Sequence, residues 1–168
     1  MRRQTRGTVV LGLCVLGVVA ALPWYRVNIS PSVPYGLYRL QPVPATLERG
    51  DLVVLPVPAS AQPWHSRWLP LLKPVAATAG QDVCVQDDTL WIGAQSYGPV
   101  RHEAHGRSLP HLEGCAIVAP GTVFLASHAP ASLDSRYFGP VAVSSLTAHA
   151  FPVLTWSPAP RADKARVH

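Results

Sequence analysis

The sequence predicts a mostly β domain behind a single N-terminal membrane segment, and three observations carry this prediction. Hydrophobic residues make up 48% of the chain and charged residues only 14%, whereas ordinary globular proteins have about 25% charged residues. The 18 prolines among 168 residues argue against long helices, because proline removes a backbone donor and breaks helix interiors. Beyond residue 25, short apolar runs alternate with Pro and Gly, as expected for short strands joined by turns.

The N-terminal segment has the order of a membrane anchor. Arg2, Arg3 and Arg6 precede an uncharged run over residues 8–24. As a helix, this run would be about 26 Å long, close to a hydrocarbon core of about 30 Å, and the arginines should stay in the cytoplasm. We therefore assign residues 1–25 to a basic cytoplasmic stub and an uncleaved anchor. A cleaved signal peptide and a buried core helix are the alternatives.

Residues 26–156 are expected to form a β-rich domain and residues 157–168 a polar tail. The expected strands cover residues 51–57, 82–86, 89–92, 121–126, 141–144 and 151–156. Asp87 and Asp88 would form the turn of a hairpin, and Pro152 would place the last strand at a sheet edge because it lacks a backbone donor. Outside the anchor, a helical period fits only residues 64–72, and residues 95–112 are expected to form an exposed loop.

Charge and histidine content favour neither a nucleic acid partner nor a metal site. The chain has a formal charge of +5, but its basic residues gather at the two ends and form no stripe of the kind that binds nucleic acid. His102, His105 and His111 share one loop, but zinc requires several convergent ligands and no second cluster supplies them. We expect solvated loop histidines and no cofactor.

The cysteines fit an exported domain. Cys14 lies in the apolar run, whereas Cys84 and Cys115 lie in the part expected outside the cytoplasm. This pair lacks the CxxC spacing of a typical zinc site. An oxidising compartment would let the two thiols form a disulfide, and two buried free thiols are the alternative.

A serine and a lysine stand out as candidate reacting groups. Residues 28–38 (NISPSVPYGLY) contain prolines and a glycine that impose an irregular backbone, able to fix a serine hydroxyl beside its own N–H. Lys73 is the only lysine between the anchor and the tail, and its neighbours are apolar. Burial lowers a lysine pKa from about 10.4 by several units and yields a neutral amine that can deprotonate a serine. A lysine whose amine reaches solvent is one alternative, and a Ser-His-Asp triad without a G-x-S-x-G elbow is another.

Four segments together form a pattern that runs through the chain. They are residues 28–38, RGDLVV at 49–54, LLKPVAA at 71–77 and SLDSRYFGP at 132–140. In this order they resemble the nucleophile box, the following strand, the lysine box and the final box of the signal peptidase I superfamily. Within that superfamily, the pattern is similar to the conjugative transfer signal peptidases of the TraF type. The final box is the most specific of the four.

The resemblance implies a role for each matched side chain. Ser32 matches the nucleophile and Lys73 matches the general base. Ser30 matches a hydroxyl that forms the oxyanion hole together with the backbone N–H of Ser32. Ser132 matches a hydroxyl that orients the lysine.

The final box also supplies a charged pair, Asp134 and Arg136, which the resemblance implies to support the site. Two positions depart from the family pattern. Val33 stands where methionine usually follows the nucleophile, and Pro74 stands where arginine usually follows the lysine. Neither departure removes a reacting group.

The resemblance implies a signal-peptidase-like β fold and a serine endopeptidase anchored by one helix in the inner membrane, with its catalytic domain in the periplasm. The implied partner is an exported precursor protein, a conjugative pilin, whose ends would be joined after cleavage if a peptide amine attacks the acyl-enzyme. A general type I signal peptidase is the alternative enzyme. An anchored β module of a secretion or transfer apparatus is the alternative without catalysis.

Overall fold

The computed structural model describes residues 22–157. The expected membrane anchor and the polar tail therefore lie almost entirely outside the described residues. Within the described part, no helix has the length and apolar character needed to cross a membrane.

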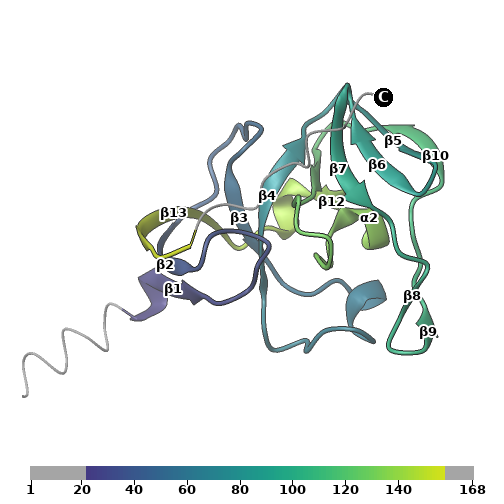
Figure 1. The fold of residues 1–168 in the computed structure, drawn as a ribbon. Coiled ribbons are helices and arrows are strands. Elements are labelled where there is room, and N and C mark those ends of the chain that lie inside the picture. Colours follow the sequence, from purple (N-terminus) through teal and green to yellow (C-terminus); the bar gives the residue numbers. More distant parts are fainter. Residues whose placement is uncertain (1–21, 158–168) are drawn as a thin grey trace, which may run out of the picture.

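The described chain is built mainly from a large antiparallel sheet of seven strands in the order β1-β2-β13-β3-β4-β11-β12 (Figure 1). Its strands are β1 (Tyr25–Asn28), β2 (Gly36–Gln41), β3 (Leu52–Leu55), β4 (Leu71–Ala77), β11 (Thr122–Leu125), β12 (Val141–Ala142) and β13 (Ala148–Thr155). The described chain also has four short helices: η1 (Leu22–Trp24), η2 (Ala59–Ala61), α2 (Ser135–Phe138) and η3 (Val143–Ser145).

A smaller sheet of four strands, in the order β10-β5-β6-β7, lies on the right in Figure 1. Its strands are β5 (Asp82–Gln86), β6 (Thr89–Ile92), β7 (Gln95–Pro99) and β10 (Gly114–Ile117). A two-stranded ribbon of β8 (Glu103–Ala104) and β9 (Arg107–Ser108) projects below it. The overall class is mostly β, as the sequence predicts.

Strand β4 crosses the centre of the molecule and is buried on both faces. Because side chains alternate along a strand, Leu71 and Val75 point to one face, where they pack with residues of β3 and β11. Leu72 points to the opposite face and packs against Val33 and Tyr38. Burial on both faces explains the nearly continuous apolar sequence of this strand. Its third residue is Lys73, which lies on the same face as Leu71 and Val75.

The hairpin predicted from Asp87 and Asp88 is confirmed with its strand bounds. Both residues have positive φ, 48° and 54°, which is the backbone of a two-residue turn that matches the twist of the strands it joins. The strands expected near residues 51–57 and 121–126 are present as the shorter β3 and β11. The segment expected at residues 141–144 pairs only over β12, and a short 3-10 helix, η3 (Val143–Ser145), follows.

Three expectations are wrong. Residues 64–72 are not helical, because they form turns up to Pro70 and then enter β4. Residues 95–112 are not a plain loop, since they contain β7, β8 and β9. The last strand, β13, is not an edge strand, since it lies between β2 and β3.

The position of Pro152 within β13 explains why that strand tolerates a proline. Only Ala148, His149 and Ala150 pair with β3, so the later part of β13 pairs with β2 alone. The register against β2 also shifts between Pro152 and Leu154. The missing N–H therefore falls where one side of the strand has no partner in the ladder.

Two of the three cysteines, Cys84 and Cys115, are joined. Cys84 on β5 and Cys115 on β10 are directly opposite each other in the antiparallel ladder, and they form a disulfide across it. The bridge closes a chain segment that contains β6 to β9 and ties the small sheet together.

Candidate active site

Ser32 lies in the connection between β1 and β2, and its side chain is almost completely buried, with 4% of the residue exposed. Asn28, the last residue of β1, organises this connection. Its Nδ2 donates to the backbone oxygens of Ser30 (2.8 Å), Pro34 (3.1 Å) and Val33 (3.2 Å). One buried side chain thus holds the backbone on both sides of Ser32.

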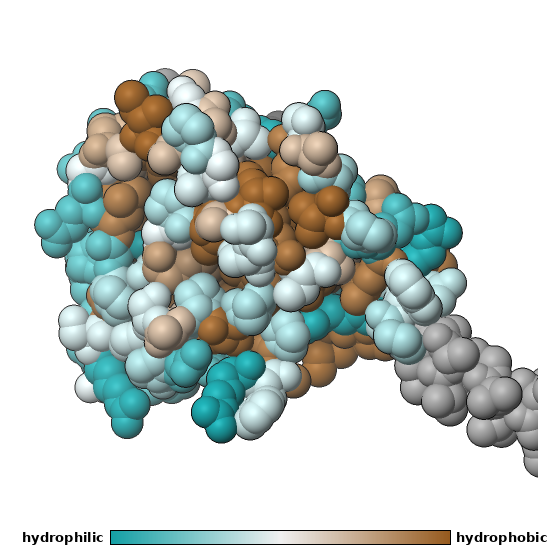
Figure 2. Space-filling view, turned by 180° about the vertical axis from the view of Figure 1, so that it is seen from behind, coloured by the Kyte–Doolittle hydropathy of each residue, from teal (hydrophilic) through white to brown (hydrophobic). Residues whose placement is uncertain are grey.

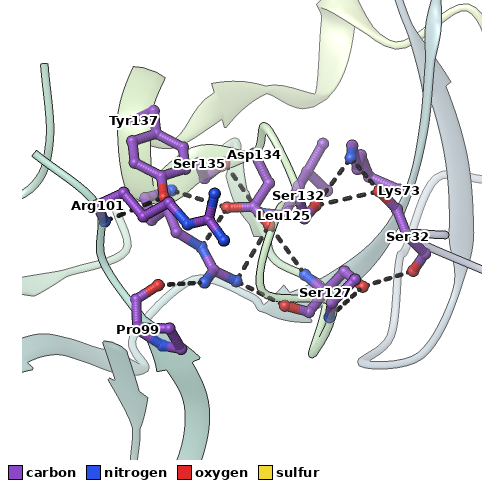
Figure 3. A network of polar contacts seen from close by, with 12 residues as sticks. Ser32, Lys73, Pro99, Arg101, Leu125, Ser127, Ser132, Asp134, Ser135 and Tyr137 are labelled. Carbon is purple, nitrogen blue, oxygen red and sulfur yellow. Dashed lines mark hydrogen bonds and ion pairs between the residues drawn. The ribbon is translucent and has the colours of Figure 1, made fainter. Parts of the chain in front are cut away.

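Lys73 reaches Ser32 from the middle of β4. Its Nζ donates to Ser32 Oγ at 2.5 Å and to Ser132 Oγ at 2.8 Å, and only 4% of the residue is exposed (Figure 3). The two hydroxyl oxygens are 3.2 Å apart. The three polar atoms form a closed triangle inside the protein, although the residues come from three distant parts of the chain.

Burial lowers the pKa of Lys73 to about 8, because the charged amine loses its water. The carboxylate of Asp134 opposes this shift in the pKa, and the guanidinium of Arg136 adds to it. A lysine with this pKa is neutral in about a tenth of the molecules at pH 7, compared with far less than a hundredth for a free lysine.

Asp134 and Arg136 form a fully buried ion pair, with both side chains 0% exposed. Arg136 Nε donates to Asp134 Oδ1 at 2.8 Å, and Arg136 Nη2 donates to Asp134 Oδ2 at 3.2 Å. Arg136 Nη1 also donates to the backbone oxygen of Pro99, at 2.9 Å. Because a charge buried without partners is very unfavourable, this set of bonds fixes the position of the segment around α2.

Ser127 connects the ion pair to Ser32 and was not singled out by the sequence. Its backbone N–H donates to Asp134 Oδ2 (3.1 Å), and its backbone oxygen accepts from Arg136 Nη2 (2.5 Å). Its hydroxyl donates to the backbone oxygen of Ser32 at 2.6 Å, as Figure 3 shows. A single serine after an apolar strand belongs to no motif, so no sequence signal could have found it.

Ser30 is placed differently from the other candidate residues. Its side chain is exposed, and its hydroxyl donates to Asn28 Oδ1 at 2.8 Å. Among residues 22–157, the structure contains no hydrogen bond between Ser30 and Ser32, although both line the same groove. To act on a substrate oxygen, the Ser30 hydroxyl would have to turn away from Asn28.

The groove in front of Ser32 and Lys73 has a volume of about 440 Å³. One wall is β1 with the connection that follows it, and the other is the segment that leads into β4, including His65 and Pro70. Ala131 and Leu133, which follow β11, also line the groove together with Ser32 and Lys73. An extended peptide would fit between these walls.

The loop histidines do not join this site. His102 lies 2.8 Å from Asp88 through its Nε2, and its ring packs edge-on against His111 with centroids 4.4 Å apart. In the described part of the chain, no group of three potential metal ligands converges.

Comparison with known families identifies the family of this chain. The model of the family described as signal peptidase, peptidase S26, matches residues 4–156. The chain belongs to this family. It is therefore a member of a family of serine peptidases, and the matched range contains all of the boxes that the sequence singled out.

Its relatives in this family are conjugal transfer proteins. The conjugal transfer protein TraF of Agrobacterium fabrum strain C58 is 34% identical, over 90% of this chain and 93% of that protein. The plasmid transfer protein TraF of Escherichia coli is 27% identical, over 93% of this chain and 98% of that protein. A signal peptidase I of Enterococcus faecalis V583 with a known crystal structure is similar over 62% of this chain and 96% of that chain, with 22% identity and a TM-score of 0.39. Within the family, the sequence of the chain is of the TraF type.

Proposed function

We propose that this protein is a membrane-anchored serine endopeptidase in which Ser32 and Lys73 act as a catalytic dyad on an exported precursor protein. The observation that carries the proposal is the 2.5 Å contact between Lys73 Nζ and Ser32 Oγ inside the protein, where the lysine pKa is lowered to about 8. Nucleophilic catalysis requires a base within hydrogen-bond reach of the serine, and Lys73 meets this requirement.

In the proposed reaction, neutral Lys73 accepts the proton of Ser32 as Oγ attacks the carbonyl carbon of the scissile peptide bond. The amine of the leaving segment then takes this proton from Lys73, and the substrate remains bound to Ser32 as an ester. Ser132 holds the lysine amine during both transfers through its 2.8 Å contact. A second nucleophile, either water or a peptide amine, then attacks the ester and releases Ser32.

The negative charge on the carbonyl oxygen needs hydrogen-bond donors in place before the reaction. The backbone N–H of Ser32 is one donor, held in position by the bonds from Asn28 and Ser127 to the surrounding backbone. The hydroxyl of Ser30 is the second donor, after it turns from Asn28. One donor of this kind changes kcat by about 100- to 1000-fold.

The proposed location is the outer face of the inner membrane, with residues 1–25 as the anchor. The end of the large sheet that follows this segment carries exposed apolar side chains, which we call the apolar sheet end. Its members are Trp24, Tyr25, Val27, Ile29, Phe151, Val153, Leu154 and Trp156. On the face of the molecule drawn in Figure 2, apolar surface extends from the middle toward the end where β1, β2 and β13 lie. Aromatic and aliphatic side chains in this position suit a membrane interface.

The proposed substrate is a conjugative pilin precursor, because the relatives are named as conjugal transfer proteins. The test is cleavage of such a precursor by the full chain in membranes, with Ser32→Ala, Lys73→Ala and, as the matched control, Ser108→Ala at an exposed strand position. We expect the first two variants to be inactive and the control to be fully active. An active Ser32→Ala variant, or a serine-reactive probe that labels the wild type elsewhere than at Ser32, would refute the dyad.

Two further experiments distinguish the alternatives. A general signal peptidase would restore bulk secretion in cells depleted of their own enzyme, whereas a dedicated one would process only the pilin. Mass spectrometry of the product reveals the second nucleophile, because a cyclic pilin is lighter than the linear product by one water molecule.

A further inference from the structure

Arg26 is a cation in the active-site groove without an ionic partner in the described structure. It lies on β1, lines the same groove as Ser32 and Lys73, and is half-buried. Its Nη2 donates to the backbone oxygen of Pro70, which joins the two walls of the groove. No ion pair of Arg26 is present within residues 22–157. Partly buried charges are usually paired. Because the bond to Pro70 uses only Nη2, the other N–H donors of the Arg26 guanidinium are left for another molecule.

No negative charge offsets Arg26 in the groove. His65 and Lys73 line it together with Arg26, and the described lining contains no carboxylate. Burial lowers the pKa of His65, and the charges of Lys73 and Arg26 lower this pKa further. The pKa of Arg26 is lowered by burial as well, but a guanidinium stays charged at any physiological pH. Arg26, together with Lys73 while its amine is protonated, therefore makes the groove cationic, whereas the lowered pKa of His65 favours its neutral form.

We propose that Arg26 is a specificity site that binds a carboxylate of the substrate close to the scissile bond. A guanidinium presents a planar fork of donors that matches both oxygens of a carboxylate, and the groove offers no other acceptor of that kind within the described residues. This inference rests on the proposed function and specifies which precursors the same site accepts.

The position of Arg26 along β1 indicates where this carboxylate lies in the substrate. Arg26 and Asn28 are on the same side of the strand, and Asn28 contacts the connection that carries Ser32. Since a strand rises about 3.3 Å per residue, the carboxylate should lie about two to five residues from the cleaved bond. It is supplied either by an Asp or Glu side chain or by the free C-terminus of a short segment beyond the bond.

An anionic lipid headgroup is a different partner that an arginine near a membrane could bind. The structure favours the peptide, because Arg26 faces into the groove that contains both reacting groups and is tied to the opposite wall at Pro70. Most of the apolar sheet end, which suits the membrane, lies outside this groove, and only its members Val27 and Ile29 also line the groove.

The test uses the full chain in detergent and peptides that contain the precursor cleavage sequence. In one peptide set, Glu or Gln is placed at each of the positions around the bond, and in a second set the C-terminus is free or amidated. The measured quantity is the ratio of kcat/KM between the charged and the neutral peptide of each pair. For the wild type we expect a ratio of about 10 to 100 at one position, the range for a charge-assisted hydrogen bond.

Two variants and a control complete the design. Arg26→Gln keeps an amide donor for Pro70 and should bring the ratio close to one, whereas Arg26→Glu should reverse it in favour of a peptide with Lys at that position. Arg39→Gln removes a charge from the neighbouring strand β2, outside the groove, and should leave the ratio unchanged. Thermal unfolding of each variant identifies any loss of folding.

The outcomes separate this inference from the proposed function. If the wild type cleaves neutral and charged peptides equally at every position, the carboxylate site is refuted and the peptidase stands. If no peptide is cleaved, the proposed function fails. A ratio near one, combined with weaker binding of Arg26→Gln to vesicles of anionic lipid, would refute the peptide site and assign Arg26 to the membrane.

Discussion

At the scale of single residues, the proposed chemistry depends on the protonation state of Lys73. Only the neutral amine can accept the proton of Ser32, and the pKa of Lys73 is lowered to about 8 by burial. We therefore predict that kcat/KM rises with pH, is half-maximal near the pKa of about 8 and levels off above it. Initial rates of peptide cleavage between pH 6 and about 9.5 measure this profile.

Substitution of the base makes the same prediction sharper. Lys73→Arg should be inactive at every pH, because a guanidinium stays protonated and cannot act as a base. A profile that is already flat above about pH 7 would indicate a histidine-like group instead and would contradict the role of Lys73.

The buried amine should also lower the stability of the protein. Below pH 8 the folded protein holds a buried charge, and between about 8 and 10.5 the unfolded chain binds more protons than the folded one, so wild-type stability rises with pH in that interval. The difference in pKa corresponds to about 3 kcal/mol. We predict that Lys73→Met raises the free energy of unfolding at pH 7 by about 1–3 kcal/mol, after the loss of two hydrogen bonds.

Urea unfolding of both proteins over a range of pH tests this prediction. The advantage of the Met variant should be largest below pH 8 and should disappear near pH 10.5, the ordinary pKa of the group. An advantage that is constant over the whole range would mean that packing, and not the buried charge, accounts for the difference.

Residue patterns in the sequence pointed to most of the side chains that the structure brings together around Ser32, but not to all of them. Ser32, Lys73, Ser132 and the ion pair belong to boxes with a fixed order, so a resemblance could find them. Asn28 lies inside the first box, and its bonds to nearby backbone oxygens are local, whereas Ser127 lies 95 positions from its partner Ser32. Contacts of this kind have no spacing rule, and they become visible only when the sheet is assembled.

At the scale of elements, the segment from β11 to α2 determines the geometry of the site. It contains Ser127 and Ser135, two buried serines whose side chains bond to different parts of the chain. Ser127 donates to the backbone oxygen of Ser32, whereas Ser135 Oγ accepts from the backbone N–H of Leu125. The two residues are therefore a matched pair for separating positioning from stability.

We predict that Ser127→Ala and Ser135→Ala lower the free energy of unfolding by similar amounts, about 1–2 kcal/mol each. Only Ser127→Ala should also lower kcat, by about tenfold, because the backbone of the nucleophile loses one fixed contact. The KM and the pH profile of this variant should stay as in the wild type, because Ser127 has no bond to Lys73 in the described structure. Equal kcat values for the two variants would reduce Ser127 to a purely structural role.

Other elements of the fold show which kinds of strand a sequence can predict. The β5–β6 hairpin was found because an Asp-Asp turn separates two apolar runs, and both signals are local. Strands β1 and β2 were not predicted, since their Arg, Asn and Gly residues break the apolar pattern, and they form because they pair with each other and with β13. The run before β4 was mistaken for a helix because a short apolar segment fits both periods.

At the scale of the whole molecule, the groove and the apolar sheet end are brought together by β1. This strand lines the groove with Arg26, Val27 and Asn28, and its Tyr25 and Val27 side chains are also exposed at the apolar sheet end. Across the sheet, Tyr25 aligns with Phe151 and Val27 with Leu154, through their shared partners on β2. A sheet end pressed against a membrane would therefore hold the groove at the surface where a membrane-bound precursor emerges.

This arrangement predicts that the apolar sheet end matters only for substrates in a membrane. We expect the double variant Leu154→Asp and Trp156→Glu to cleave a membrane-embedded precursor about tenfold more slowly, since partial burial of two such side chains is worth about 1–2 kcal/mol. Cleavage of a soluble peptide with the same sequence should be unaffected, because neither residue lines the groove. Ile117→Asp is the matched control, since Ile117 is 68% exposed but lies on β10 in the small sheet, and both of its rates should equal those of the wild type. If the double variant slows both substrates equally, the substitutions have altered the fold or the groove; if it slows neither, this surface does not contact the membrane.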